Sequence, residues 1–365
     1  MQRGGVIFRQ LQCLQSQTYT YLLGCPRTRE ALLIDPVLGN VDRDSALAAE
    51  LDLKVVLTVE THVHADHVTG ASALREKWGS RVAVPKKALV AGADVALAEG
   101  DTLRVGDTVE LQCLETPGHT DACMSFFAPA GPWVFSGDAL LIRGCGRTDF
   151  QSGSAPTLFR SIRQKLLSLP DETLVFPGHD YRGLTASSVR EERLHNPRVG
   201  GEIAEHDFVG FMRNLNLPHP RQMAEAVPAN MQCGRLQGAG ATSVAPAAAG
   251  WGEERHLSRT LSGHFEVDGQ WLEEHLGRCV VLDVRDADEV AAAGLGCIPG
   301  SRFVPLDWLQ AELPALAREA LPVIFVCRAG ARSAQACVML TKSGNAHCAS
   351  LRQGLLQWNR EGRAV

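Results

Sequence analysis

Residues 54–78 read KVVLTVETHVHADHVTGASALREKW, and this stretch decides the fold of the first part of the chain. The apolar run KVVLTVE predicts a buried strand, and the spacing of apolar residues in ASALREKW predicts an amphipathic helix. The turn between them holds side chains able to bind a metal: His62, His64, Asp66 and His67. Imidazole and carboxylate groups need partners once they are buried, so we expect a metal site here rather than a set of hydrogen-bonded loop residues.

Three further candidates follow downstream, each directly after an apolar, strand-like run. They are His119 in TPGHT, Asp138 in FSGDAL and His179 in FPGHDY. A lone Gly-His or Gly-Asp pair is more often a turn than a ligand, so none of them would stand out alone. Loops that leave the same edge of a sheet can meet, however, and the ordered set predicts that these side chains join the first group.

The rest of the N-terminal part alternates short strand-like runs with glycine turns. The runs YTYLL, ALLID, VELQCLE and PWVFSGD predict a layered α/β or α+β architecture in which helices cover the sheets. After Pro177 the pattern becomes helical, and SSVREERL and AEHDFVGFMRNL place apolar residues three or four apart. These helices are expected to close the first domain.

The length of 365 residues favours two domains. A stretch rich in Gly, Ala and Pro, CGRLQGAGATSVAPAAAGWGEER, has no apolar periodicity and predicts a flexible connector. We place the first domain at residues 1–234, the linker at 235–255 and the second domain at 256–365. Beyond the linker, the runs CVVLDVR, LPVIFVC and AHCASL alternate with helical patterns, which predicts a small parallel sheet covered by helices.

Cys327 ends the apolar run LPVIFVC, and RAGARSAQACVML continues it as a helix with Arg332 in its first turn. Backbone N–H groups at the start of a helix, together with the charges of Arg328 and Arg332, can stabilise a thiolate or a bound oxyanion. We therefore expect an acidic, reactive Cys327 rather than an ordinary buried cysteine. Only four residues separate Cys327 from Arg332, one fewer than in cysteine phosphatases, so sulfur transfer is favoured over phosphate chemistry.

The overall composition excludes several classes of protein. The formal net charge of -5 arises from 41 acidic and 36 basic residues mixed along the chain, without a basic block that could bind a nucleic acid. The sequence has no apolar run behind a basic start of the kind that directs export. No apolar run approaches the length that spans a membrane. The 11 cysteines lack the regular spacing of a disulfide framework. We expect a cytoplasmic protein of the bacterial type with reduced thiols.

The ordered motifs H-x-H-x-D-H, PGHT, GDAL and PGHDY resemble the metallo-β-lactamase superfamily, whose ligands can hold two metals. Further segments, FRQL, TYTYLL, LIDPV, IRGCGRTDFQSG, NPR and NLNLP with VPANMQCG, look like the persulfide dioxygenase family over about residues 6–234. The resemblance implies an αββα metallo-β-lactamase sandwich with one ferrous iron, Fe(II), held by His62, His119 and Asp138. Such a face leaves positions open at which the sulfur of glutathione persulfide and dioxygen bind as neighbours, yielding sulfite and glutathione.

The same resemblance gives His64, Asp66, His67 and His179 a supporting role, as groups that orient the iron ligands by hydrogen bonds. In two-metal relatives these residues hold a second ion, and the sequence leaves that alternative open. The runner-up function is a two-zinc thioester hydrolase of the glyoxalase II type, in which a bridging hydroxide attacks a carbonyl.

Glutathione persulfide carries carboxylates that require cationic or hydroxyl partners near the iron. Tyr181 and Arg198 match positions associated with glutathione binding in the family, and Arg143 and Arg147 flank the neighbouring loop. For Arg147 a second interpretation is equally open, in which it braces the loop through a carboxylate such as Asp149.

The second domain resembles the rhodaneses over about residues 257–362, through CRAGAR, VVLDVRDADEV and CIPGSRFVPL. The resemblance implies a small α/β rhodanese domain in which the Cys327 thiolate attacks the outer sulfur of thiosulfate and expels sulfite. Glutathione then removes the sulfur held as a persulfide, while Asp283 and Arg285 brace the loop. The segment AAAGLGCIPGS lacks the Gly-His pair of many rhodaneses, so we expect this loop to be longer or differently packed.

The fusion joins two activities that share glutathione persulfide and sulfite, and the direction of sulfur flow between them is open. A non-catalytic sensing or docking role for the second domain is the alternative, against which the intact Cys327 argues. The expected partners are glutathione persulfide, dioxygen, thiosulfate and glutathione, with no nucleic acid and no membrane. A homodimer is one option for the assembly.

Overall fold

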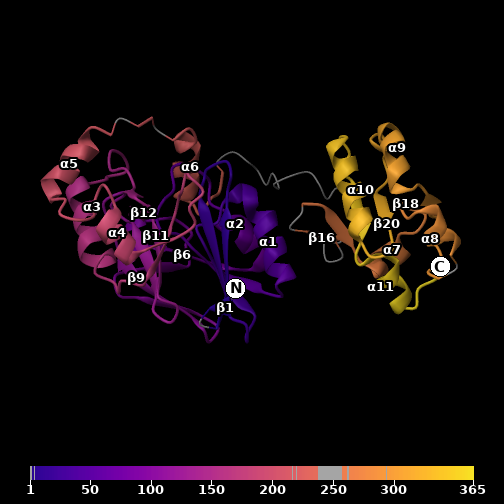
Figure 1. Ribbon diagram of the computed structural model, residues 1–365, viewed down its shortest axis with the longest axis horizontal. Coiled ribbons are helices and arrows are strands. Elements are labelled where there is room, and N and C mark those ends of the chain that lie inside the picture. The colour runs from indigo at the N-terminus through magenta and orange to yellow at the C-terminus, as the bar shows by residue number, and fades with distance from the viewer. Residues whose placement is uncertain are drawn as a thin grey trace. The chain divides into compact units, whose positions relative to one another are not determined.

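The computed structural model describes residues 2–3, 5–215, 217–218, 220–236, 257–260, 263–292 and 294–365. Contacts divide the chain into two compact units, Met1–Ala239 and Gly240–Val365, each of which is described by itself (Figure 1). The connector expected at residues 235–255 lies outside the described residues, apart from Arg235 and Leu236.

The first sheet of the N-terminal unit has seven strands in sequence order. They are β1 (Gln2–Arg3), β2 (Val6–Gln12), β3 (Tyr19–Gly24), β4 (Glu30–Ile34), β5 (Lys54–Val59), β6 (Arg81–Pro85) and β7 (Val95–Leu97). Neighbours are antiparallel up to β4 and parallel from β4 to β7. The parallel strands β4 and β5 end at one edge, and a carboxylate follows each of them directly, Asp35 and Glu60.

The second sheet of this unit has six strands in the order β15-β14-β11-β10-β9-β8. They are β8 (Thr102–Val105), β9 (Val109–Glu115), β10 (Met124–Ala128), β11 (Trp133–Gly137), β14 (Leu174–Pro177) and β15 (Ser187–Ser188), beside a small hairpin of β12 (Leu140–Leu141) and β13 (Gly144–Cys145). Alternating apolar residues of the two sheets form one shared core, in which the Phe135 ring lies 4.9 Å from Tyr21 and 5.6 Å from Phe176 between centroids.

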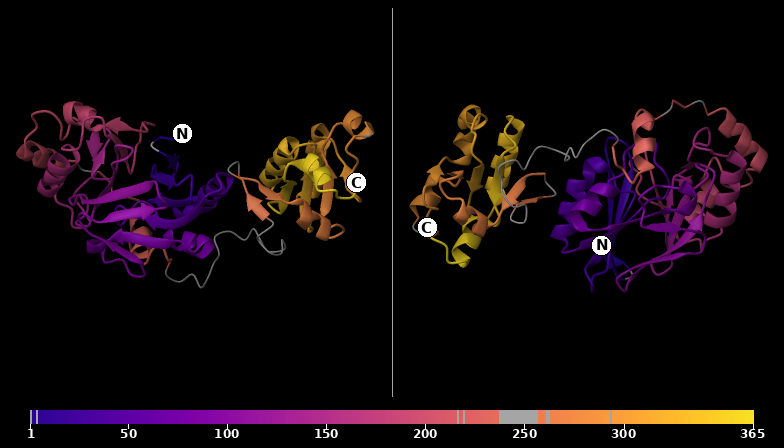
Figure 2. Two further views of the ribbon diagram at one scale, coloured as in Figure 1. Left: turned by 90° about the horizontal axis from the view of Figure 1, so that it is seen from below. Right: turned by 180° about the vertical axis from the view of Figure 1, so that it is seen from behind.

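Helices cover the outer faces of both sheets. They are α1 (Val41–Glu50), α2 (Ala71–Trp78), α3 (Ala155–Ser161), α4 (Val189–His195), α5 (Glu205–Arg213) and α6 (Met223–Asn230), with short turns η1 (Leu38–Asn40), η2 (Lys86–Ala88) and η3 (Ile162–Leu166). Leu47 of α1 and Leu74 of α2 pack on the first sheet, and Leu158 of α3 and Phe208 of α5 pack on the second. The layers follow the order helix, sheet, sheet, helix (Figures 1 and 2), which confirms the predicted αββα architecture.

The C-terminal unit is built on six strands in the order β16-β17-β21-β20-β18-β19. They are β16 (Leu257–Arg259), β17 (Phe265–Val267), β18 (Val280–Asp283), β19 (Arg302–Phe303), β20 (Val323–Val326) and β21 (Cys348–Leu351). All pairs are parallel except the edge pair of β16 and β17. The predicted small parallel sheet is therefore confirmed, with one antiparallel edge strand added.

Helices lie on both faces of this second-unit sheet (Figure 2). They are α7 (Gly269–Glu274), α8 (Ala287–Ala291), α9 (Leu309–Leu316), α10 (Ala331–Lys342) and α11 (Gly354–Arg360), with the short turn η5 (Leu306–Trp308). Trp271 of α7 and Trp358 of α11 belong to the core on one face, and Leu309 of α9 and Leu340 of α10 to the core on the other. In the described part of the chain, no helix has the length and apolar character needed to span a bilayer.

Candidate functional site

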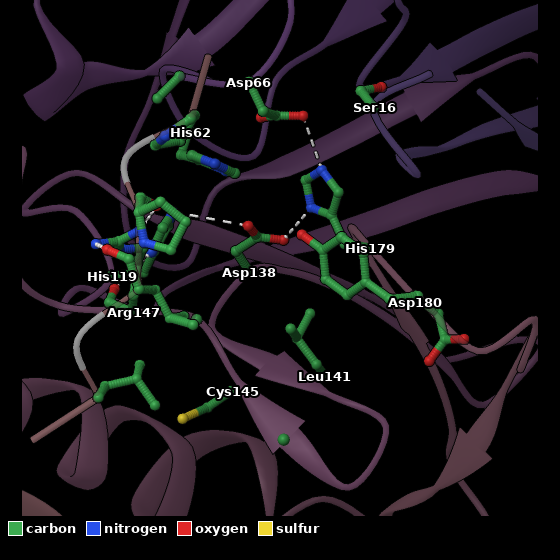
Figure 3. Close-up of a pocket in the computed structure, with 18 of the residues that line it drawn as sticks. Ser16, His62, Asp66, His119, Asp138, Leu141, Cys145, Arg147, His179 and Asp180 are labelled. Carbon is green, nitrogen blue, oxygen red and sulfur yellow. Dashed lines mark hydrogen bonds and ion pairs between the residues drawn. The ribbon is translucent and has the colours of Figure 1, made fainter. Parts of the chain in front are cut away.

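The metal-binding side chains of the N-terminal unit collect at the ends of its central strands. His62 follows β5, His119 lies in the turn after β9, and Asp138 follows β11. One ligand-type atom from each lies within 4.8 Å of the other two, which is close enough for a single ion to bind all three. The structure therefore brings together the residues that the resemblance assigns to iron (Figure 3).

Both imidazoles are oriented by hydrogen bonds at the nitrogen that faces away from the centre. The Nδ1 of His62 lies 2.9 Å from the hydroxyl of Thr61. That hydroxyl donates to Asp35 at 2.8 Å, and the backbone N–H of Thr61 donates to the same carboxylate at 2.7 Å. The Nδ1 of His119 donates to the carbonyl of Arg147 at 2.7 Å. Supporting bonds of this kind fix the tautomer and leave each Nε2 available to a metal.

The charge states of this group suit a cation. Burial lowers the pKa of His62 well below its ordinary value, and the neighbouring His64 and His119 lower it further, so its imidazole is neutral. Burial opposes the charge on Asp138, but His179 and His119 outweigh it and hold the pKa of that carboxyl below its usual range. Two imidazoles and one carboxylate are a ligand set that suits a divalent transition metal.

Behind Asp138 lies a second group of predicted residues, Asp66, His67 and His179. His179 bridges two carboxylates, with Nδ1 at 2.7 Å from Asp138 Oδ1 and Nε2 at 2.9 Å from Asp66 Oδ2 (Figure 3). The Nδ1 of His67 lies 3.1 Å from the same Asp66 oxygen. Asp66 and His67 also lie close enough to His64 for those three to share an ion.

His64 is turned toward a different pair of carboxylates. Its Nε2 lies 3.1 Å from Asp35 and 3.4 Å from Glu60, and all three side chains are buried. Burial alone would lower the pKa of His64, but the two carboxylates prevail and raise it to about 10. In this arrangement His64 is a buried cation that forms ion pairs with Asp35 and Glu60.

The three central residues border a cavity of about 1010 Å³, at the upper end of the volumes usual for small-molecule sites. All four residues expected to contact glutathione line it, but they differ in how free they are. Arg143 is paired with Glu191 and with the fully buried Glu192, and Arg147 is paired through two nitrogens with Asp149, each at 2.6 Å. The geometry of Arg147 is thus that of the loop-bracing interpretation.

The other two residues expected to contact glutathione, Arg198 and Tyr181, are less engaged by neighbouring side chains. The guanidinium of Arg198 donates to the carbonyl of Cys145 at 2.9 Å and lies 5.1 Å over the ring of Phe211. Among the residues that the structure describes, it has no carboxylate partner. Tyr181 is 71% exposed and stacks against His179 at 6.0 Å between ring centroids.

Several residues of this cavity escaped the sequence reasoning. They include Gln15, Ser16, Arg182 and Arg221 in the lining, and Thr18 behind it. Asp35 and Glu60 could have been identified from the sequence, because each directly follows a strand of the parallel part of the sheet. Thr18 had none, since a threonine next to a strand is common and only the fold places it beside His179.

In the C-terminal unit, Cys327 directly follows β20, and the loop up to Gly330 leads into α10. Gly330 adopts a φ of +104°, which glycine adopts readily. The backbone N–H of Gly330 donates to the Cys327 sulfur at 3.1 Å, and the hydroxyl of Ser333 lies 3.4 Å from it. Burial raises the pKa of this thiol, but the bonds from Ser333, Gly330 and Ala329 outweigh it, and the net pKa is lowered. The expected acidic thiol is thus supported by its surroundings.

The two arginines of this loop differ. Arg328 is exposed and, among the described residues, has no ion pair or side-chain hydrogen bond. Arg332 is held by carboxylates at the start of α8, at 3.0 Å from Asp286 and 2.5 Å from Glu289. Arg328 therefore offers an unpaired charge near the sulfur, whereas the charge of Arg332 is shared with two acids. The role expected of both arginines at the sulfur stays a prediction, and the structure adds that Arg332 has two acidic partners.

Asp283 and Arg285 form a buried ion pair, with their closest atoms at 2.6 Å. Arg285 also donates to the carbonyl of Gly296 at 2.8 Å and contacts the sulfur of Cys297 at 3.4 Å. The pair therefore braces the loop before IPG, where the sequence departs from the usual rhodanese pattern.

An αββα unit with clustered histidines and aspartates at its strand ends, followed by a small α/β unit with a cysteine loop, defines a metallo-β-lactamase-type protein joined to a rhodanese-type domain. Sequence profiles agree: that of the metallo-β-lactamase superfamily matches residues 14–179, and that of the rhodanese-like domain matches residues 268–361.

Three known proteins narrow the family. "Persulfide dioxygenase ETHE1, mitochondrial" of Mus musculus is 48% identical over 229 residues, covering 63% of this chain and 89% of that protein. The crystal structure of ETHE1 from Myxococcus xanthus is 52% identical, with a TM-score of 0.61, and covers 63% of this chain and 100% of that one. A hydroxyacylglutathione hydrolase of Polaromonas sp. is 38% identical over 169 residues, covering 45% of this chain and 63% of that protein. The chain belongs to the persulfide dioxygenase family of the metallo-β-lactamase superfamily and carries a rhodanese-like domain in addition.

Proposed function

We propose that the N-terminal unit is an iron-dependent dioxygenase that oxidises glutathione persulfide to sulfite and glutathione. The observation that carries the proposal is the convergence of His62, His119 and Asp138 on one point at the wall of a cavity of about 1010 Å³. The similarity to proteins named persulfide dioxygenases supports the choice of substrate class. Glutathione persulfide, dioxygen and water then yield glutathione and sulfite, and the electrons lost by the outer sulfur reduce dioxygen.

The residues of the chain have separable tasks in this proposal. His62, His119 and Asp138 would hold the iron, and Thr61 and the Arg147 carbonyl orient the two imidazoles. Bound iron would supply adjacent coordination positions for the persulfide sulfur and dioxygen. Arg198, without a carboxylate partner in the described chain, would bind a carboxylate of glutathione, and the phenol of Tyr181 would contribute a hydrogen bond.

We propose that the C-terminal unit transfers sulfur between thiosulfate and glutathione through Cys327. The thiolate attacks the outer sulfur of thiosulfate, a sulfur–sulfur bond forms, and sulfite leaves with the electron pair of the broken bond. Glutathione thiolate then takes the sulfur and regenerates Cys327. The exposed charge of Arg328 is suited to a dianionic donor, and the Gly330 N–H stabilises the thiolate that departs in the second step.

The test combines two measurements on the full-length protein. Oxygen uptake with glutathione persulfide is followed with an electrode, and bound metal is determined by elemental analysis. The expected result is persulfide-dependent oxygen uptake with about one iron per chain. Two zinc ions per chain without oxygen uptake would overturn the proposal.

A two-zinc thioester hydrolase is the second candidate, because Asp66, His67 and His179 stand beside the first group and a hydroxyacylglutathione hydrolase is among the relatives. Hydrolysis of a glutathione thioester by the zinc-loaded protein, at a rate that exceeds oxygen uptake by the iron-loaded protein, would favour it.

We further propose a cytoplasmic location. All of the cysteines are free, as a reducing compartment would keep them.

A further inference from the structure

Three side chains with metal-binding atoms stand behind Asp138 and face one buried hydroxyl, that of Thr18. Thr18 is 0% exposed. Its Oγ1 lies 3.0 Å from His179 Nε2, 3.2 Å from Asp66 Oδ2 and 3.3 Å from His67 Nδ1. A single hydroxyl oxygen is thus within hydrogen-bond range of all three potential ligands.

The backbone fixes this hydroxyl in place. Thr18 forms an isolated β-bridge with His179, and the next residue, Tyr19, donates its N–H to the carbonyl of Gly178 at 2.8 Å. On the other side, the carbonyl of Thr18 accepts from the N–H of Cys13 at 2.8 Å. Because these bonds tie Thr18 to the same loop that carries His179, the hydroxyl cannot withdraw without disturbing that loop.

One carboxylate oxygen of Asp66 has three hydrogen-bond donors when Thr18 is included. Asp66 Oδ2 accepts from His179 at 2.9 Å, from His67 at 3.1 Å and from Thr18 at 3.2 Å. A hydroxyl has one proton and two lone pairs, so Thr18 donates to Asp66 and can accept from Ser16, whose Oγ lies 2.7 Å away. This oxygen of the half-buried carboxylate therefore has three hydrogen-bond donors without a cation.

We propose that the Thr18 hydroxyl is a positioning group that keeps Asp66, His67 and His179 from taking a second ion, and so confines the centre to one. An ion held at about 2.0–2.2 Å by nitrogen and oxygen ligands would have to break the bonds to Asp66. It would also compete for the space beside a hydroxyl that lies within 3.3 Å of each ligand. The inference rests on the proposed function, because it explains why that function uses one metal.

The experiment measures metal stoichiometry rather than turnover. The full chain, carrying Cys327→Ser so that this thiol does not bind the probe, is stripped of metal, dialysed against a series of zinc concentrations and analysed for bound zinc. The parent protein and Thr18→Ser, which keeps the hydroxyl, are expected to bind one ion in the N-terminal unit. Thr18→Ala is expected to bind a second ion at zinc concentrations at which the parent binds one, because Asp66, His67 and His179 no longer face the hydroxyl.

Ser16→Ala is the matched control, because it removes a hydroxyl bonded to Thr18 but leaves the contacts of Thr18 with the three ligands. It should bind one ion. If Thr18→Ala is folded by circular dichroism and still binds one ion, the role of Thr18 is refuted while the proposed function stands. If the parent itself binds two ions, the single-metal function fails as well. Should Thr18→Ala not fold, Thr18→Val removes the hydroxyl at similar volume, and a single ion in that variant likewise refutes the inference.

Discussion

The two candidate sites of this chain are assembled in opposite ways. The metal centre draws His62, His119 and Asp138 from three loops that only the packed sheets bring together. The cysteine site lies within one continuous loop, from Cys327 to Arg332, between β20 and α10. A contiguous site depends on local backbone geometry, whereas an assembled site depends on the whole fold. Substitutions should therefore affect the two sites independently and to different extents.

The largest effect is expected at the contiguous site. Cys327→Ser should abolish sulfur transfer from thiosulfate, because a serine hydroxyl neither ionises near neutral pH nor accepts sulfur readily. Oxygen uptake with glutathione persulfide should be unchanged. Parallel assays of sulfur transfer to cyanide or glutathione and of oxygen consumption check both. A joint loss of the two activities would show that the sites are coupled.

At the assembled centre, Asp138→Ala should lower metal affinity by more than about 100-fold, since losing even an outer partner of a ligand costs about 10–100-fold. Oxygen uptake should fall with it, while sulfur transfer by Cys327 persists. Zinc titration of the stripped protein and elemental analysis measure the loss. Asp121→Ala is the control, because Asp121 is an exposed carboxylate two residues after His119. Unchanged metal affinity in Asp138→Ala would remove Asp138 from the ligand set.

The buried ion pair of Asp283 and Arg285 is expected to affect the stability of the C-terminal unit rather than the sulfur-transfer reaction. Arg285→Met leaves the carboxylate of Asp283 buried without its partner, which should cost about 3–5 kcal/mol of unfolding free energy in the C-terminal unit. Urea denaturation of the full chain, followed by tryptophan fluorescence, should show this transition at lower urea. Arg302→Met removes an exposed pair with Glu312 and should cost less than about 1 kcal/mol. Equal effects of the two variants would contradict the role given to burial.

A smaller effect is expected where the cavity binds substrate. Arg198→Met should raise the KM for glutathione persulfide about tenfold with little change in kcat, because hydrogen bonds to charged groups contribute about 1.5–3 kcal/mol. Arg163→Met is a close control. Arg163 also donates to backbone carbonyls and lies over a phenylalanine ring, but it does not line the cavity. A drop in kcat without a change in KM would argue against carboxylate binding by Arg198.

The smallest effect concerns the pH profile of Cys327. Hydrogen bonds lower the pKa of this thiol, so the thiolate persists at high pH and is lost as the pH falls through that value. Ser333→Ala removes one of the bonds and should move the acidic limb upward by about 0.5–1 pH unit. The rate of alkylation by iodoacetamide against pH reports the shift. Ser343→Ala should leave the profile in place, because the Ser343 hydroxyl donates to the Met339 carbonyl and not to the Cys327 sulfur within the described chain.

The sequence predicted those structural elements that are formed by one continuous stretch of residues. Strand-like runs such as KVVLTVE and LPVIFVC became β5 and β20, and the helix after Cys327 became α10. That loops after apolar strands would meet was also predictable, but the choice of His62, His119 and Asp138 within the larger set came from the family resemblance. The sequence did not predict which charged residues far apart in the chain form ion pairs with one another. Nothing in the sequence indicates that Arg332 is held by Asp286 and Glu289.

The same limit explains the glutathione contacts. Four residues with suitable chemistry were identified, but their availability depends on neighbours far away in sequence. Arg143 is neutralised by Glu192, which is 0% exposed and reaches it only through the packing of α4 on the β12–β13 hairpin. Arg198 lacks such a neighbour in the described chain. A residue type predicts what a side chain can bind, whereas the fold decides whether it is already bound.

The first residue of α11 links the reactive loop to a later part of the chain. A Cβ on Gly354 would lie 2.3 Å from the carbonyl oxygen of Cys327, and the N–H groups of Leu355 and Leu356 donate to the carbonyls of Cys327 and Arg328 at 2.9 and 3.1 Å. During synthesis, the cysteine is therefore made before the segment that shapes its surroundings. The carbonyls of the cysteine loop acquire these two hydrogen bonds only when α11 has docked, so the loop around the nascent thiol takes its final shape after the segment that begins at Gly354 has been made.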